Sequence, residues 1–259
     1  MPGEIRVERQ GAIARVVLAH PGKLNAMSRG MWRALREAFV ALHADDTCRA
    51  IVVQGDGGQF CAGGDIAEYP EFRFDPAALA DFHERDVWGG LGAVLDCDVP
   101  VIACIEGACM GAGVEIAACC DLRHAGAAAK FGAPIARLGF PMAPREMEVV
   151  LAAAGEATVR EMLLAASAVD APEMKSRGFL HAVWPDAEVA AHAMHLAERI
   201  ARLAPQAARL NKQALRRLRA YHPVARWSAA ELAAAYAYAP GEEHREGVSA
   251  FLDKRQPRF

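Results

Sequence analysis

The sequence predicts an α/β fold, and three observations support this prediction. Short apolar runs alternate with helical segments over the first half of the chain. Two glycine-dense turns, within 55–66 and 106–113, directly follow such runs, as expected where a strand leads into a helix. From about residue 144 the chain is rich in alanine and leucine and looks helical throughout, with prolines as breaks. Strands separated by helices favour crossover connections.

The elements of the first half can be placed in order. Residues 4–19 are expected to form two strands with a turn near Gly11. Ser28 suits the N-cap of the helix that follows, because the apolar residues after it keep a helical spacing. The later elements expected are a strand at 48–55, a helix from about Pro76 to Leu95, and strands at 99–106 and 121–125.

The second half is expected to consist of helices, at 156–166, 186–204, 205–221 and 225–239. A helical tail of this kind packs on its own core or on a neighbouring subunit. We expect a core at 1–195 and a C-terminal helical region at 196–259.

Composition excludes several classes of protein. The 259 residues are enough for one large domain, and 53% of them are hydrophobic. A net charge of −3 gives no global basic field, so nucleic acid is not an expected partner. The N-terminus has no apolar signal core and no apolar run approaches about 18 residues, so a cytoplasmic protein without a membrane partner is expected. The seven cysteines suit reduced core thiols better than disulfides.

The stretch EGACMGAGVEIAACCD, at 106–121, could bind a phosphate or a carbonyl oxygen on its backbone N–H groups. A dinucleotide site needs a third glycine where Ile116 stands and an acidic residue about 20 positions on, and neither is present. No Gly-Lys-Ser/Thr occurs, which excludes a Walker loop. The second loop, FCAGGDI, would let two amides converge on one oxygen as an oxyanion hole; the alternative is that both are only tight turns.

Several ordered motifs resemble the enoyl-CoA hydratase/isomerase (crotonase) family, nearly from end to end. HPGKLNAM, at 20–27, looks like its early signature, and FCAGGDI resembles its first oxyanion loop. The run from 99 to 134 resembles the central signature, and EGVSAFLDKR matches the closing segment. The resemblance implies repeated ββα turns in an acyl-CoA-binding core, a C-terminal trimerisation region, and assembly as a homotrimer or a dimer of trimers. It also implies an acyl-CoA thioester substrate whose carbonyl becomes an enolate-like oxyanion.

The resemblance also assigns roles to single residues. The oxyanion-hole amides would be those of Ala62 and Ala112. Glu115 aligns with one of the two glutamates that hold the attacking water in the hydratases, although a carboxylate in the first turn of a helix can simply complement the helix dipole.

This chain departs from the family where the second glutamate is expected, because FGAPI places Ile135 there. The following loop, PMAPREM, offers Glu146 as a possible second acid; the alternative is a solvated pair of Arg145 and Glu146 that begins a helix. His83 and His124 lack a paired nucleophile or metal spacing, which favours packed or partly exposed histidines.

Coenzyme A is expected as part of the substrate, with no other cofactor and no metal. The resemblance places its contacts at Lys23, Leu24, Ala62, Gly63, Gly64, Asp65, Ile66, Phe251 and Lys254. The function expected is therefore acyl-CoA processing with Glu115 as the single family carboxylate. The alternatives are isomerase, decarboxylase or thioester hydrolase chemistry, or a catalytically weak acyl-CoA-binding protein.

Overall fold

The computed structural model describes residues 2–221, 230 and 234–259. It has a mixed α/β fold, as predicted, built around a six-stranded sheet in the order β1-β2-β3-β4-β6-β9. β1 and β2 form an antiparallel hairpin through Gly11, whose φ of +58° suits glycine, and the other neighbours pair in parallel. The six strands are Glu4–Gln10, Ile13–Ala19, Ala50–Gly55, Val101–Ile105, Leu122–Gly126 and Ala182–Trp184.

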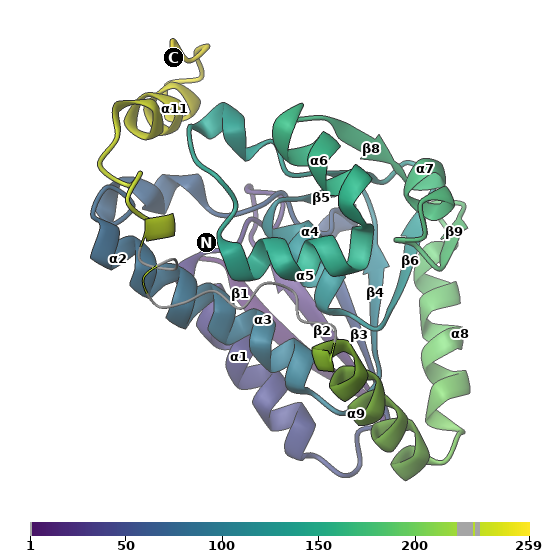
Figure 1. Cartoon of the computed structure of the whole chain (residues 1–259). Helices are drawn as coiled ribbons and strands as arrows, with labels where there is room; N and C mark the ends of the chain where they lie inside the picture. Colours follow the sequence, from purple (N-terminus) through teal and green to yellow (C-terminus); the bar gives the residue numbers. More distant parts are fainter. Residues whose placement is uncertain (1, 222–229, 231–233) are drawn as a thin grey trace.

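A smaller sheet has the order β5-β7-β8 and lies beside the large one (Figure 1). The chain alternates between the two sheets, because β4 leads to β5 and then to helix α4, and β6 leads to β7. This is the repeated ββα arrangement that was predicted. The elements concerned are β5 (Ala108–Met110), α4 (Ala112–Cys119), β7 (Lys130–Gly132) and β8 (Ala168–Asp170).

Helices cover both faces of the large sheet. Alternate residues of a strand point to opposite faces, so Ile51 and Val53 of β3 join the main core with α1 (Arg29–Ala44) and α3 (Trp88–Asp96). Val52 faces the other way and packs with α8 (Val189–Ala201). β4 is consequently apolar throughout, and β3 is apolar except for Gln54 near its end, as is typical of strands buried on both faces.

The remaining elements are short connections and the C-terminal helices. They are η1 (Asp56–Gly58), η2 (Ile66–Glu71), α2 (Pro76–Asp81), η3 (Phe82–Val87), η4 (Ile135–Leu138), α5 (Pro144–Ala154), α6 (Glu156–Leu164), α7 (Ala171–Ser176), α9 (Pro205–Tyr221) and α11 (Glu242–Leu252).

Most of the elements predicted from the sequence are present. The hydroxyl of Ser28 accepts the N–H of Met31, so Ser28 is the N-cap of α1, as predicted. The helix expected from Pro76 to Leu95 is continuous, but its middle segment, η3, is a π-helix. The expectation that the chain is helical throughout from residue 144 was wrong, because β8 and β9 interrupt it. Each has only three residues and is stabilised by pairing with a distant strand, β7 or β6, which local composition does not reveal.

The structure does not test two further expectations, which concern the helix at 225–239 and the division of the chain into two regions. The helix expected at 225–239 lies largely outside the described residues. The division of the chain at residues 195 and 196 falls within α8, which packs on the large sheet. A role of residues 196–259 in trimer assembly stays a prediction.

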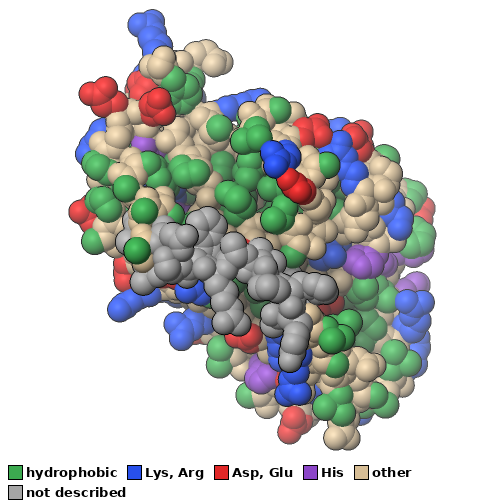
Figure 2. Space-filling model, viewed as in Figure 1, with side chains coloured by type: hydrophobic (Ala, Val, Ile, Leu, Met, Phe, Trp, Pro, Cys, Tyr) green, Lys and Arg blue, Asp and Glu red, His purple; other side chains and the backbone are tan. Residues whose placement is uncertain are grey.

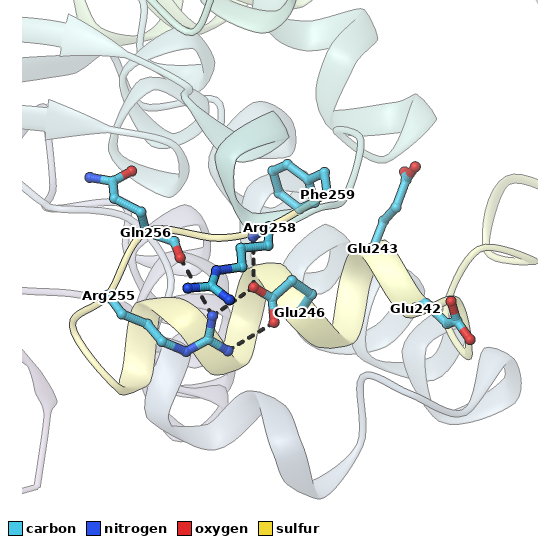
Figure 3. Close-up of a pocket in the computed structure, with 7 residues that line it drawn as sticks. All are labelled: Glu242, Glu243, Glu246, Arg255, Gln256, Arg258 and Phe259. Carbon is cyan, nitrogen blue, oxygen red and sulfur yellow. Dashed lines mark hydrogen bonds and ion pairs between the residues drawn. The ribbon is translucent and has the colours of Figure 1, made fainter.

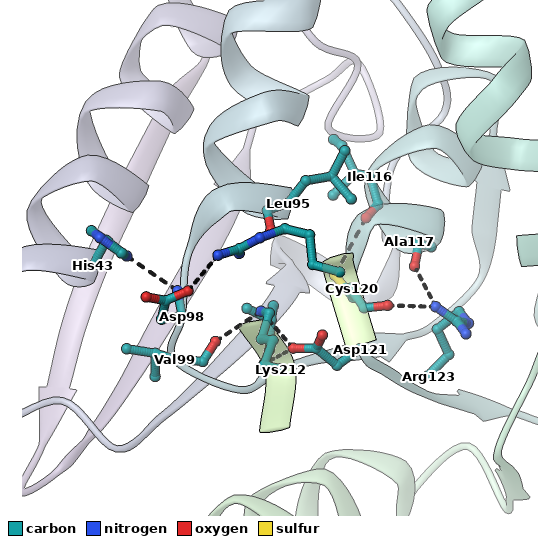
Figure 4. A network of polar contacts seen from close by, with 12 residues as sticks. His43, Leu95, Asp98, Val99, Ile116, Ala117, Cys120, Asp121, Arg123 and Lys212 are labelled. Carbon is teal, nitrogen blue, oxygen red and sulfur yellow. Dashed lines mark hydrogen bonds and ion pairs between the residues drawn. The ribbon is translucent and has the colours of Figure 1, made fainter. Parts of the chain in front are cut away.

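Polar contacts attach α9 to the ends of β4 and β6 (Figure 4). Lys212 Nζ lies 2.6 Å from the Asp121 carboxylate and donates to the Val99 carbonyl oxygen at 3.0 Å. Arg216 and Gln213 both donate to the Asp98 carboxylate, at 2.7 Å each. Because Lys212 is buried, its charge depends on these partners.

The substitution Lys212→Met should lower the free energy of unfolding by about 1–3 kcal/mol, because it leaves two acceptors without their donor. Lys130→Met, at an exposed position of β7, is the matched control and should change it by less than about 0.5 kcal/mol. Urea unfolding of the three proteins measures both effects. Equal losses in the two variants would contradict the assigned role of Lys212.

Candidate active site

The two glycine loops predicted from the sequence lie side by side. Cys61 donates its backbone N–H to the Ala108 carbonyl oxygen at 2.8 Å, and Met110 donates back to Cys61 at 2.9 Å. Further along, a side chain at Gly111 would contact the Cα atom of Gly63 at 3.6 Å. Backbone hydrogen bonds and close backbone approach therefore hold the loop before η2 against the loop before α4.

Two amides at this junction are free. Among the described residues, no acceptor takes the backbone N–H of Gly64 or of Ala112, which is the first residue of α4. The N–H of Ala62 is in a different situation, because it donates to the carbonyl oxygen of Leu24 at 3.0 Å. Leu24 has a φ of +47°, which is uncommon for a residue with a side chain. In the first loop the N–H of Gly64 is thus free, whereas the N–H of the predicted Ala62 is occupied.

Two carboxyl groups approach each other beyond these amides. Glu115 lies in the first turn of α4 and Glu146 in the first turn of α5, and the two helices pack together. The side chain of Glu146 is only 2% exposed, whereas Glu115 is intermediate in exposure. Arg145 forms its ion pair with Glu84, at 3.0 Å. The alternative of a solvated pair of Arg145 and Glu146 is therefore wrong.

Burial raises the pKa of both carboxyl groups to about 8. The negative charge of Glu146 raises the pKa of Glu115 further, and the Arg73 guanidinium acts in the opposite direction on both. Two nearby carboxyl groups of this kind do not ionise independently, so the pair retains a proton near neutral pH. One member can then accept a proton while the other donates one.

Aromatic and basic side chains surround the pair. Arg73 is 1% exposed and lies over the rings of Tyr69 and Phe140, with centroid distances of 4.2 and 4.0 Å. It donates to Tyr238 and His244, which belong to the C-terminal part of the chain. Within the described residues it has no carboxylate within ion-pair distance, so its charge acts on the site without neutralising either glutamate.

His83 contacts Glu146 directly, with 2.8 Å between its Nδ1 and Oε1 of the carboxyl group. The sequence predicted a packed or partly exposed histidine at this position, and its side chain is 12% exposed. The contact joins residues 63 positions apart, so no local sequence pattern could have predicted it.

The other predicted site residues lie in three separate places. Ile135 is half-buried in η4 and packs against the main core, so it supplies no second acid. Lys23 Nζ pairs with the Asp65 carboxylate at 2.6 Å, which brings the 20–27 signature and the 62–66 loop together. Phe251 and Lys254 are exposed at the end of α11 and in the turn after it.

A hollow at the C-terminal end of the molecule does not coincide with this site (Figure 3). Its lining is mostly charged, and Arg255 and Glu246 form an ion pair across it at 2.6 Å. None of the predicted catalytic or coenzyme A-binding residues lines it. The face in Figure 2 mixes acidic and basic side chains, in agreement with the absence of a basic field.

Two further absences concern the described part of the chain. No group of three or more histidine, cysteine or acidic residues there is arranged to hold a metal ion. No helix there has both the length and the apolar character that a membrane span requires.

Comparison with known proteins is consistent with this geometry. The enoyl-CoA hydratase/isomerase family model matches residues 8–259. A probable enoyl-CoA hydratase of Mycobacterium bovis is 31% identical, over 98% of this chain and 97% of the relative. Among solved structures, an enoyl-CoA hydratase/carnithine racemase from Magnetospirillum magneticum is 36% identical with a TM-score of 0.82, covering 98% and 94% of the two chains. A methylmalonyl-CoA decarboxylase in complex with 2-nitronate-propionyl-CoA is 26% identical with a TM-score of 0.86, covering 100% and 99%.

The fold and the site thus define an α/β protein that presents free backbone amides beside one buried and one half-buried carboxyl group. The chain belongs to the enoyl-CoA hydratase/isomerase family, which has the crotonase fold and acts on acyl-CoA thioesters.

The contact between the two loops should be sensitive to added volume at Gly113. A Cβ atom there would lie 2.6 Å from the carbonyl oxygen of Cys61, so Gly113→Ala should lower the free energy of unfolding by about 1–3 kcal/mol. Gly89→Ala in α3 is the control, because its Cβ atom would make an ordinary 3.5 Å contact with Arg36. Thermal unfolding should show a loss only for Gly113→Ala, and a similar loss in both variants would disagree with a tight junction.

The buried carboxyl pair should also make stability depend on pH. The folded-state pKa values, about 8, lie above the ordinary value of 4.5, so the associated stability is fully present below about pH 4.5 and is lost as the pH rises towards 8. We therefore expect Glu115→Gln to raise the Tm relative to the wild type by about 2–6 °C at pH 8 and by less at pH 5. Glu37→Gln, on the exposed face of α1, should give no such difference. A Tm gain that is independent of pH would argue against the raised pKa values.

Proposed function

We propose that the protein adds water across the double bond of a 2-enoyl-CoA thioester, with Glu115 and Glu146 as the two proton-transferring groups. The observation that carries this proposal is the pairing of these carboxyl groups in the first turns of α4 and α5, beside the free N–H of Ala112. The hydratase names among its relatives support the same reaction class.

The backbone amides of Gly64 and Ala112 would bind the thioester oxygen. Addition to the double bond places negative charge on this oxygen, and two preorganised N–H donors stabilise it more in the transition state than in the ground state. Glycine is required at both turns, because a Cβ atom at Gly64 would overlap the Tyr69 hydroxyl oxygen and Gly111 has a φ of +47°. This assignment replaces Ala62 with Gly64 and retains Ala112.

The carboxyl pair would supply the remaining chemistry. Glu115, as the anion, accepts a proton from water while the water oxygen bonds to the β-carbon. The π electrons of the substrate move to the thioester oxygen and form an enolate. Glu146, as the acid, then donates its proton to the α-carbon, and transfer of the proton held by Glu115 restores the pair. The three steps together add one water molecule and leave the protein unchanged.

Glu146 removes the main sequence-based objection to hydration. Ile135 occupies the position where the family has its second glutamate, and the substitution suggested single-carboxylate chemistry. In the fold, a carboxyl group from α5 lies near enough to Glu115 to influence its ionisation. We infer that the second acid is supplied from a different place in the sequence.

The coenzyme A part of the substrate would extend along the surface formed by Lys23, Leu24 and the 62–66 loop. Lys23 is exposed beside this loop and can act as a point charge for a phosphate, although it already pairs with Asp65. Phe251 and Lys254 are proposed to contact the coenzyme A of a neighbouring subunit in a homotrimer or a dimer of trimers, in agreement with their exposure at the end of α11 and in the turn after it.

Turnover assays distinguish hydration from the other reactions. We expect the purified protein to hydrate crotonyl-CoA, measured as loss of the conjugated enoyl absorbance and appearance of 3-hydroxybutyryl-CoA. Glu115→Gln and Glu146→Gln should each lower kcat by roughly 10²–10⁴-fold while binding of the thioester persists, because general acid–base catalysis contributes about this much.

The outcome also separates the alternatives. Isomerisation of a 3-enoyl-CoA that survives Glu146→Gln would indicate chemistry with a single carboxylate. Decarboxylation of methylmalonyl-CoA without hydration would favour the activity in the name of the structurally similar decarboxylase. Equal binding of coenzyme A esters by all variants, with no turnover of any substrate, would identify an acyl-CoA-binding protein.

A further inference from the structure

We propose that His83 is a positioning residue for Glu146, in which the Nδ1–H group holds Oε1 of the carboxyl and leaves Oε2 as the oxygen that exchanges a proton with the substrate. This inference rests on the proposed function, because it concerns the acid of that reaction. It adds a residue from another helix to the site and assigns separate tasks to the two oxygens of Glu146.

The geometry places His83 against Glu146 from a separate element. The 2.8 Å contact joins Nδ1 to Oε1, and the side chains of His83 and Glu146 are 12% and 2% exposed. His83 lies in η3, the π-helical segment, and π-helical turns are frequent at functional sites. Tyr236 stacks on the imidazole with a centroid distance of 5.6 Å, and Phe82 contacts it edge-on. The ring is therefore held in one orientation.

The second ring nitrogen decides which tautomer is present. Nε2 of His83 is buried and, in the described structure, has no hydrogen-bond partner. A proton on Nε2 would be a buried N–H donor without an acceptor, which is unfavourable. The tautomer with the proton on Nδ1 is favoured instead, because Glu146 accepts that hydrogen bond. Burial also lowers the pKa of His83 well below its ordinary range, which keeps the ring neutral. A neutral ring with Nδ1–H can donate to Oε1 whether Glu146 is ionised or protonated, and the acidic proton then resides on Oε2.

The charged and titratable groups around His83 and Glu146 come from several elements. Glu115 approaches from α4, Arg145 from α5 and Glu84 from η3. Arg73 acts on both residues from the segment after η2, and Tyr236 and Tyr238 approach from the C-terminal part of the chain. A change of pH dependence at Glu146 is therefore compared among variants of His83, which leave all of these groups in place.

The test compares side chains that keep or remove the Nδ1–H donor. His83→Leu should lower kcat for enoyl-CoA hydration by about 10-fold with KM changed less than about twofold. It should also move the alkaline fall of the pH–rate profile to higher pH, because the Glu146 anion loses a hydrogen bond. His83→Asn places an amide N–H near the position of Nδ1 and should restore both kcat and the profile. His83→Gln places its amide farther along the chain and should not.

Two controls make the result specific. Tyr236→Phe keeps the ring on His83 and removes only the hydroxyl, which donates to Glu84 at 3.1 Å, so it should leave the profile unchanged. In a Glu146→Gln background, His83→Leu should change residual kcat by less than about twofold, because His83 acts through Glu146.

The outcomes separate this inference from the proposed function. Wild-type kcat and pH profile in His83→Leu, together with an inactive Glu146→Gln, would overturn the role of His83 alone. Similar behaviour of His83→Asn and His83→Gln would also overturn it, and this comparison remains available if His83→Leu does not fold. Full activity of Glu146→Gln would instead reject the proposed role of Glu146, and with it the inference.

Discussion

The backbone contact between the loops at 61–64 and 108–112 is the constraint on which the rest of the site depends. Hydrogen bonds between Cys61 and the residues of β5 fix the positions of the two loops relative to each other, and small residues allow their backbones to approach closely. This contact fixes the start of α4, and therefore the positions of the Ala112 amide and of Glu115. The carboxyl of Glu146 becomes a neighbour only because α5 packs on α4. One main-chain junction thus organises amides and carboxyl groups that come from three distant parts of the chain.

Burial gives these groups their chemical character. Near neutral pH an exposed carboxyl group is an anion and a poor acid, whereas the surroundings of Glu115 and Glu146 favour the proton-bound form. The Arg73 guanidinium, which lies within the aromatic cluster, lowers the pKa of both carboxyl groups and so favours their ionisation. The pair is therefore balanced between two protonation states, which a single exposed glutamate would not be. The balance costs stability, as is common for functional sites.

Sequence predicted the parts of this structure that depend on local pattern. The hairpin at 4–19, the capped helix after Ser28 and the glycine turns are all present, because period, capping and turn chemistry are local properties. β8 and β9 were missed, since three-residue strands depend on distant partners. The same limit applies to the site. Glu115 follows from a motif, but the burial of Glu146, its contact with His83 and the occupied N–H of Ala62 depend on contacts between distant segments.

The π-helical turn between α2 and α3 has a consequence for how the site can change. A π turn bonds i to i+5 and so holds one residue more than an α turn, and here it lies between two helices, α2 and α3. Loss of one codon within 82–87 would rotate His83 relative to Glu146 without altering either residue. Relatives that keep both side chains but differ in the length of this helix would then differ in the proton chemistry of the site.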